Sequence, residues 1–264
     1  TRSLDEYAPG DGDAWRRLYA LWTEVGDGLV RSLLSPFPPV LPAAGLVWRL
    51  GPTGVLRLAR RVTLPARRFG EEEFAGAGGA LLIAGNTLHT DLSPEGATGA
   101  LIGWLLCSLA QQHGFPVPEG GAGQLAAALV RRLESRGGRV ECGNRVVRIV
   151  VEGRRAIGVT TGDGSDVRVR RAVLAEVDAP QLFLDLVGPD HLSGDFLADL
   201  RRFHFDHATV KVDWALDAPI PWKLEGPGDA GTVHLADSMD ELTHYSAELA
   251  PGQLPRQPFP SSGR

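Results

Sequence analysis

The feature of the sequence that most constrains its fold is the order of elements between Pro118 and Pro180. A glycine-rich turn precedes a predicted helix over residues 124–135, in which the apolar residues recur at helical spacing. A series of short β-rich runs follows over residues 140–142, 146–151, 156–161, 166–170 and 172–175. A single helix followed by closely spaced strands predicts a β-meander, and residues 180–187 then predict a further short helix.

The chain before this stretch is predicted to be mainly helical. Apolar residues recur at helical spacing between residues 13 and 32, and a Gly51-Pro52 break separates two shorter helices over residues 41–49 and 55–62. Ser93-Pro94-Glu95 combines a capping serine, a proline at the first helical position and an early carboxylate. This signal predicts a helix from Ser93 to about His113.

The chain after residue 190 shows weaker patterns. A short helix is expected over residues 195–202, and the partial alternation of residues 209–216 predicts a long strand. Residues 232–235 are the predicted partner of that strand. The final residues, 251–264, are rich in proline, serine and glycine and are expected to fray.

The charge and the cysteine content exclude several classes of protein. A net charge of −5 gives no electrostatic reason to expect binding to nucleic acid. Cys107 and Cys142 are far apart in the chain, so neither a disulfide framework nor a structural zinc site is expected, as in a reducing cytoplasm. The apolar run over residues 97–110 is too short to span a bilayer.

A group of arginines leaves two interpretations open. These residues fall on predicted helices and would form a mixed basic face, which is either a solvated surface or a peripheral contact with anionic lipid headgroups. The arginines are Arg57, Arg60, Arg61, Arg67 and Arg68.

The glycine turn formally matches a dinucleotide-binding fingerprint, Gly121-x-Gly123-x-x-Ala126. That fingerprint requires a buried parallel strand immediately before its first glycine, yet Pro116 and Pro118 precede it here. Proline removes a ladder donor and does not occur in a central strand. We therefore predict a glycine turn that leads into a helix whose N-terminus faces an electron-rich group, such as a flavin ring or a carboxylate.

These motifs together resemble a known superfamily of flavoproteins. The turn and helix start Gly-Gly-Ala-Gly-Gln-Leu over residues 120–125, the strand Val146-Val-Arg-Ile149 and the closing run 172–178 resemble the phytoene-desaturase-like and amine-oxidase-like enzymes. The closest subfamily is the bacterial phytoene-dehydrogenase-like oxidoreductases. The resemblance implies an α+β fold: a partial FAD-binding domain (glycine turn, helix and β-meander) with a split, largely helical substrate domain. It assigns residues 118–190 to the FAD-binding domain, and residues 1–117 and 191–264 to the substrate domain.

The resemblance also implies FAD as the cofactor and a set of site residues. Val146 falls at the position whose backbone meets the adenine in this superfamily. The other residues implied to bind the cofactor are Gly120, Gly121, Gly123, Ala175 and Asp178. The family's N-terminal G-x-G-x-x-G strand and its C-terminal glycine-rich segment have no counterpart here, so we expect an internal fragment that is inactive alone and binds FAD weakly.

The implied reaction is hydride transfer from a C–H bond of a hydrophobic small-molecule substrate to flavin N5. Lys211 falls where the amine-oxidase branch places a lysine that holds a water near N5, although a salt bridge or a surface lysine is the alternative. A flavin-dependent amine oxidase, a flavin-dependent isomerase and a non-catalytic binding module remain open.

The histidines indicate little chemistry. His204 and His207 are three residues apart, which places them on opposite faces of a strand, so no metal site is predicted. His89 and Asp91 lie in a predicted loop after Asn86, which leaves two interpretations. They either line a substrate cavity or take part in a hydrogen-bond network within the loop. The sequence carries no signal for an oligomeric state.

Overall fold

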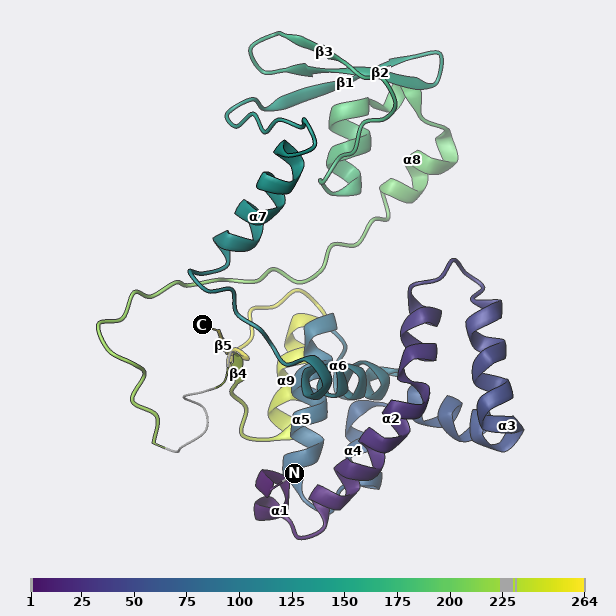
Figure 1. The fold of residues 1–264 in the computed structure, drawn as a ribbon, viewed down its shortest axis with the longest axis vertical. Helices are drawn as coiled ribbons and strands as arrows, with labels where there is room; N and C mark the ends of the chain where they lie inside the picture. Colours follow the sequence, from purple (N-terminus) through teal and green to yellow (C-terminus); the bar gives the residue numbers. More distant parts are fainter. Residues whose placement is uncertain (1, 224–229, 231, 264) are drawn as a thin grey trace. The chain divides into compact units, whose positions relative to one another are not determined.

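A computed structural model describes residues 2–223, 230 and 232–263, which form two compact units (Figure 1). Unit 1 is discontinuous and contains Thr1–Val117 and His207–Arg264. Unit 2 is Pro118–Asp206, the stretch between those two segments. The predicted functional assignments of the domains stay predictions, because a division into compact units assigns no function. None of the helices in the described residues is long and apolar enough to cross a membrane.

Unit 1 is helical and contains the main hydrophobic core. Trp104 is almost fully buried at its centre and meets Trp22 edge to face, with ring centroids 5.6 Å apart. Phe69, Ile83 and Leu242 close the same core from three other helices. The helices are α1 Arg2–Tyr7, α2 Asp11–Leu33, α3 Val40–Thr63, α4 Ala66–Glu73, α5 Ala77–Thr87, α6 Gly99–His113 and α9 Met239–Leu249.

The two helices predicted on either side of Gly51 are confirmed as the two arms of α3. Gly51 has φ 65° and ψ 173°, which interrupts the helix in the left-handed half of the backbone map. The predicted start of the next long helix is wrong, because α6 begins at Gly99 and not at Ser93. Ser93 instead closes a local turn, in which its hydroxyl accepts from the Glu95 amide and its carbonyl accepts from the Gly96 amide.

Helix α5 has no predicted counterpart, and its packing explains why it forms. Its sequence, Ala-Gly-Gly-Ala-Leu-Leu-Ile-Ala-Gly-Asn-Thr, has low intrinsic helix propensity. Close packing against α6 compensates for this: a Cβ on Gly103 would lie only 2.3 Å from the carbonyl oxygen of Ile83. Glycine at this position therefore lets the two helix backbones approach each other.

Unit 2 consists of helix α7, an antiparallel sheet and three further short helices. Helix α7 spans Gly123–Glu134, and Gly137 ends it with φ 81° while the Gly138 amide donates to the Leu133 carbonyl. The predicted hairpin is confirmed: β1 Val146–Glu152 pairs antiparallel with β2 Arg155–Thr161, and β2 pairs with β3 Asp166–Arg168. A π-helix over Gln181–Val187, a 3-10 helix over Pro189–His191 and helix α8, Gly194–Leu200, complete the unit.

Three predicted strands are wrong. Residues 140–142, 172–175 and 209–216 form no strand, because no neighbouring chain offers them ladder hydrogen bonds. Leu174 and Val210 are accordingly 95% and 87% exposed. The predicted pairing of residues 232–235 is also wrong, since β4 Thr232–His234 pairs with β5 Ser261–Gly263. The last residues of the described chain are therefore held in a two-stranded sheet.

Candidate functional site

The glycine turn before α7 is open on its outer side. Gly120 and Gly121 have φ values of 82° and 92°, a conformation that side chains other than glycine rarely adopt. A Cβ on Gly121 or Gly123 would meet no atom within 4 Å. The glycines at 120 and 121 are thus required by the backbone conformation, and the space is open at Gly121 and Gly123, whereas the Gln124 side chain lies against Gly120.

The N-terminal end of α7 offers free hydrogen-bond donors. The Gly121 amide donates to the Pro118 carbonyl, and the Gln124 amide donates to the Gly121 carbonyl. Between them, the amides of Ala122 and Gly123 donate to no acceptor among the described residues. Exposed amides at a helix start favour an electron-rich partner. Residues 114–118 form no strand in front of the turn, so the dinucleotide fingerprint lacks its required structural context.

Strand β1 follows the end of α7 that is opposite the glycine turn (Figure 1). The helix contains 12 residues, which corresponds to about 18 Å along its axis. Val146 begins β1, pairs with Thr161 and is followed by an irregularity in the register before Arg148. In the described sheet β1 is an edge strand, so one side of its backbone carries no ladder partner. The structure therefore separates Gly120, Gly121 and Gly123 from Val146.

Ala175 and Asp178 lie in the extended segment after β3. Ala175 is exposed and belongs to no strand. Asp178 caps the following helix, since its carboxylate accepts from the Gln181 amide at 2.8 Å and its carbonyl accepts from the Leu182 amide. These bonds satisfy donors at the start of the π-helix. If Asp178 also contacts a cofactor, its carboxylate must do so while it accepts from the Gln181 amide.

Lys211 lies in unit 1, on the exposed extended segment that was predicted to be a strand. Its ammonium group forms an ion pair with Asp213. Both side chains are largely exposed, so solvent screens the pair and it contributes little to stability. The premise that an apolar strand buries Lys211 is therefore wrong, whereas its catalytic role stays a prediction.

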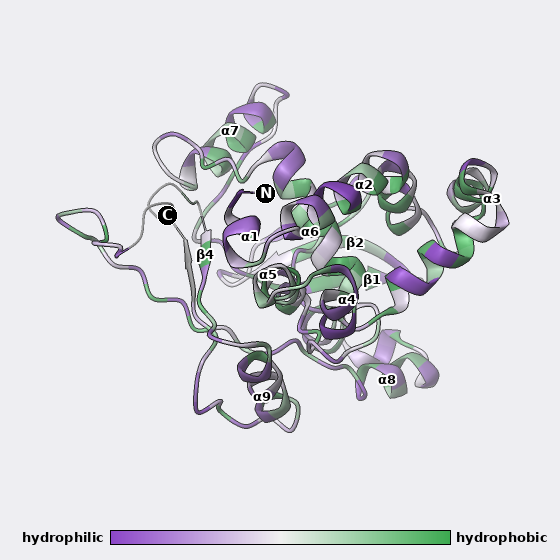
Figure 2. Cartoon of the chain, turned by 90° about the horizontal axis from the view of Figure 1, so that it is seen from below, coloured by the Kyte–Doolittle hydropathy of each residue, from purple (hydrophilic) through white to green (hydrophobic). Residues whose placement is uncertain are grey.

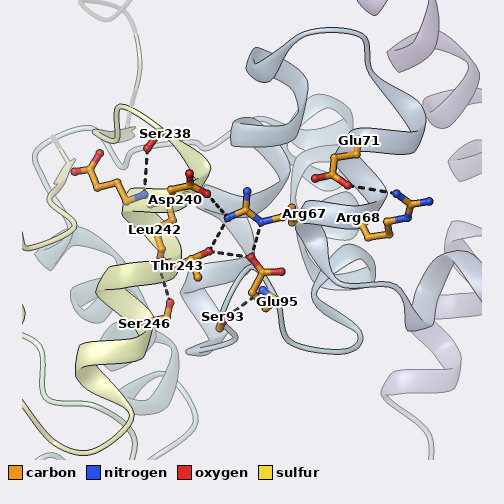
Figure 3. Close-up of polar contacts among 11 residues, drawn as sticks. Arg67, Arg68, Glu71, Ser93, Glu95, Ser238, Asp240, Leu242, Thr243 and Ser246 are labelled. Carbon is orange, nitrogen blue, oxygen red and sulfur yellow. Dashed lines mark hydrogen bonds and ion pairs between the residues drawn. The ribbon is translucent and has the colours of Figure 1, made fainter.

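A polar network that the sequence did not reveal joins three parts of unit 1 (Figure 3). Arg67 of α4 donates through Nε to Glu95 at 2.5 Å and through Nη2 to Asp240 of α9 at 2.7 Å. Thr243 accepts from the same guanidinium and donates to Glu95. Burial acts to lower the pKa of Arg67, but the hydrogen bonds to Glu95 and Asp240 outweigh burial and raise it. The network links α9 to α4.

Two histidines also meet within unit 1. The Nε2 atoms of His89 and His234 are 2.9 Å apart, so one ring donates and the other accepts. Burial, followed by repulsion from His89, lowers the pKa of His234. Asp91 accepts from the His207 amide and also lines a cavity of about 110 Å³ beside Tyr245, whereas His89 does not line that cavity; a role in substrate binding stays a prediction. Within the described part of the chain, no group of three or more possible ligands could hold a metal ion.

The two features of unit 2 that bear on the predicted cofactor site are the helix start and the sheet edge. Unpaired amides of Ala122 and Gly123 stand at one end of α7, and the free edge of β1 follows its other end. The buried thiol of Cys107, by contrast, is no candidate nucleophile, because burial raises its pKa to about 12.

Comparison with known proteins gives one match. The model of the family described as flavin-containing amine oxidoreductase matches residues 57–248, which include parts of unit 1 and all of unit 2. No curated protein and no solved structure matches the chain. The matched residues make up well over half of the sequence, and they contain the glycine turn, α7 and the meander. The chain therefore belongs to the flavin-containing amine oxidoreductase family.

Proposed function

We propose that the protein is an FAD-dependent oxidoreductase of the dehydrogenase or desaturase type, most similar to the phytoene-dehydrogenase-like enzymes. The observation that carries this proposal is the family match over residues 57–248, since the family is flavin-containing. When bound, FAD supplies the redox chemistry by accepting a hydride from a substrate C–H bond at N5. The chain's own residues bind, orient and shield the reactants.

The arrangement of α7 supports a defined orientation of the cofactor. FAD is an elongated molecule, with adenine at one end and the isoalloxazine ring at the other. The free backbone edge at Val146 would hold the adenine, and the amides of Ala122 and Gly123 would face an electron-rich group toward the other end. The length of α7 separates these two contacts, as an extended nucleotide requires.

A matched pair of glycine variants tests this orientation. Gly121 and Gly164 have similar φ values of 92° and 86°, and a Cβ at either position would meet nothing within 4 Å. Alanine therefore introduces a similar backbone strain at both positions. We expect Gly121→Ala, and not Gly164→Ala, to weaken FAD binding in the purified protein, as measured by quenching of flavin fluorescence. Equal effects of the two substitutions would argue against a cofactor at the turn.

The choice of substrate separates two branches of the family. We propose a hydrophobic substrate, following the resemblance to the desaturase-like enzymes. The family description favours an amine as the second candidate. Anaerobic stopped-flow mixing distinguishes them: bleaching of the flavin band by a polyene or lipid-like substrate supports the first candidate. Bleaching by simple amines alone supports the second.

The role proposed for Lys211 can be tested in the same reaction. If Lys211 positions a water near N5, Lys211→Met slows flavin reduction, while Asp213→Asn leaves the rate unchanged because Asp213 only pairs with the lysine on the surface. An unchanged rate in Lys211→Met would remove Lys211 from the mechanism.

A further inference from the structure

The end of α2, the first arm of α3 and the start of its second arm are here called the tip, which is defined as residues 28–59. Within unit 1 the tip stands away from the core helices α5 and α6 (Figure 1). Its ribbon carries hydrophobic residues along much of α3 (Figure 2). Leu46 and Leu50 contact the core, and Leu58 is buried in it, so the base of the tip is anchored.

The tip exposes eight large apolar side chains between residues 33 and 56. Phe37 is 94% exposed and Trp48 is 91% exposed, with no described side chain covering them. Monomeric soluble proteins rarely leave so many large apolar groups together in water, and such patches mark interaction sites. The exposed apolar residues of the tip are Leu33, Leu34, Phe37, Val40, Leu41, Val47, Trp48 and Leu56.

The charge of the tip is purely positive. Residues 28–59 contain three arginines and no aspartate, glutamate or lysine, although the whole chain carries −5. Arg31, Arg49 and Arg57 are exposed, and none of them pairs with a described carboxylate; Arg49 donates to the carbonyl oxygen of Glu24. These charges therefore remain available to an anionic partner.

The position of these charges changes the interpretation of the basic helix face. Four of the arginines in that predicted face are neutralised by neighbouring carboxylates. They are Arg60, Arg61, Arg67 and Arg68. Among the described contacts, only Arg57 of the five has no carboxylate partner, and it belongs to the tip. Contact with lipid would therefore involve the tip and not the paired arginines at the end of α3 and in α4.

The two helices of the tip pack against each other on its inner side. The two helices touch where a Cβ on Gly28 would lie 2.6 Å from Leu46, so the absence of a side chain at Gly28 permits the contact. The hydroxyl of Ser32 bonds back to the Gly28 carbonyl within α2. Because the tip is closed on its inner side, its exposed apolar residues cannot turn inward to escape water.

We propose that the tip is a docking surface for a membrane that contains anionic lipid. Aromatic and aliphatic side chains flanked by basic residues insert at the boundary between headgroups and acyl chains. Trp48 and Phe37 would enter this boundary, and the three arginines would contact lipid phosphates, which suit bidentate guanidinium binding. The proposal rests on the tip alone and is independent of the flavin chemistry.

Vesicle sedimentation of the chain tests the proposal. Vesicles made of equal parts phosphatidylcholine and phosphatidylglycerol are expected to pull down the chain, and pure phosphatidylcholine vesicles much less. Replacing Arg31, Arg49 and Arg57 with glutamine should lower the partition coefficient about fivefold for each charge removed. The double variant Phe37→Ser/Trp48→Ser should lower it by at least about tenfold, because two large apolar groups no longer leave water.

A matched control separates the tip from exposed aromatic residues elsewhere. Trp214 is also largely exposed, and Trp214→Ser should leave vesicle binding unchanged. Circular dichroism should show the same helix content in all variants, since every substituted side chain is exposed.

Three results would overturn the proposal. The first is that the wild-type chain does not bind the anionic vesicles, and the second is that it binds neutral vesicles equally well. The third is that the tip joins two copies of the chain: analytical ultracentrifugation would then show a dimer that Phe37→Ser/Trp48→Ser converts into a monomer, without any vesicle binding.

Discussion

Units 1 and 2 bury their apolar residues to very different extents. In unit 1, Trp104, Phe69 and Ile83 are almost completely inaccessible, and six helices contribute to one core. In unit 2, only Ile149, Gly158, Thr161 and Leu200 are buried among residues 118–206, all of which the structure describes. The three leucines of α7 are exposed. Burial of apolar surface is the main favourable term in folding, so unit 1 is predicted to be the more stable unit by far.

Removing the largest side chain of the unit 1 core should have the largest effect. Trp104→Ala deletes an indole that is 1% exposed and leaves a cavity, so we expect the free energy of unfolding to fall by about 3–5 kcal/mol. Urea unfolding followed by circular dichroism measures the change. The exposed Trp214→Ala should stay within about 0.5 kcal/mol of the wild type. A small effect at Trp104 would contradict the assignment of the core to unit 1.

A buried carboxylate sharpens the comparison further. Asp11 is 1% exposed and accepts from the amides of Ala75 and Gly76 at 2.7 and 3.1 Å. Asp11→Ala leaves both donors without their partner, and we expect a loss of about 2 kcal/mol in urea unfolding. The control Asp13→Ala removes only an exposed pair with Arg16 and should cost little. Equal losses from the two substitutions would mean that the burial of Asp11 is unimportant.

The contact between His89 and His234 predicts a modest pH dependence in unit 1. Burial, followed by the charge of His89, lowers the pKa of His234 below its ordinary value of 6.5, so the unfolded chain binds this proton more readily. The stabilising contribution is therefore complete above pH 6.5 and is lost as the pH falls toward the lower pKa of the folded state. Thermal unfolding between about pH 5 and 7.5 measures this slope. His234→Phe should reduce it, and an unchanged slope would exclude His234 as its source.

The smallest effect is expected on the exposed face of α7. Leu129→Ser removes a side chain that contacts water, so the stability of the chain should change by no more than about 0.5 kcal/mol. The buried Ile149→Ala in β1 serves as the positive control and should cost more. Hydrogen exchange, read over α7 and β1 separately, measures both. A large loss from Leu129→Ser would show that something covers α7 and would remove the contrast between the units.

The elements that could be predicted from the sequence are those determined locally. The hairpin turn at Gly153 and Arg154, the glycine that ends α7 and the break at Gly51 each depend on a few adjacent residues, and each is confirmed. Helix α9 also has a local signal, a capping box that begins at Ser238. Its hydroxyl accepts from the Glu241 amide, and the Glu241 carboxylate accepts from the Asp237 amide.

The elements that could not be predicted depend on distant partners. Helix α5 depends on the close approach of α6 that Gly103 permits. Residues 209–216 form no strand because no described segment pairs with them. The network of Arg67 joins positions 173 residues apart, which no periodicity reveals. For the candidate site, the glycine conformations follow from their position in a turn. By contrast, the sequence alone does not show that the length of α7 sets the spacing between the glycine turn and β1. That inference also needs the elongated shape of the ligand.

The bond between Arg67 and Asp240 also has a consequence for synthesis on the ribosome. Arg67 emerges early, whereas its partner on α9 follows only after all of unit 2 has been translated. Until then, the face of α5 that packs against α9 stays uncovered in the nascent chain. Chaperones would therefore meet this face before release, and a ribosome stalled within residues 118–206 would leave it exposed.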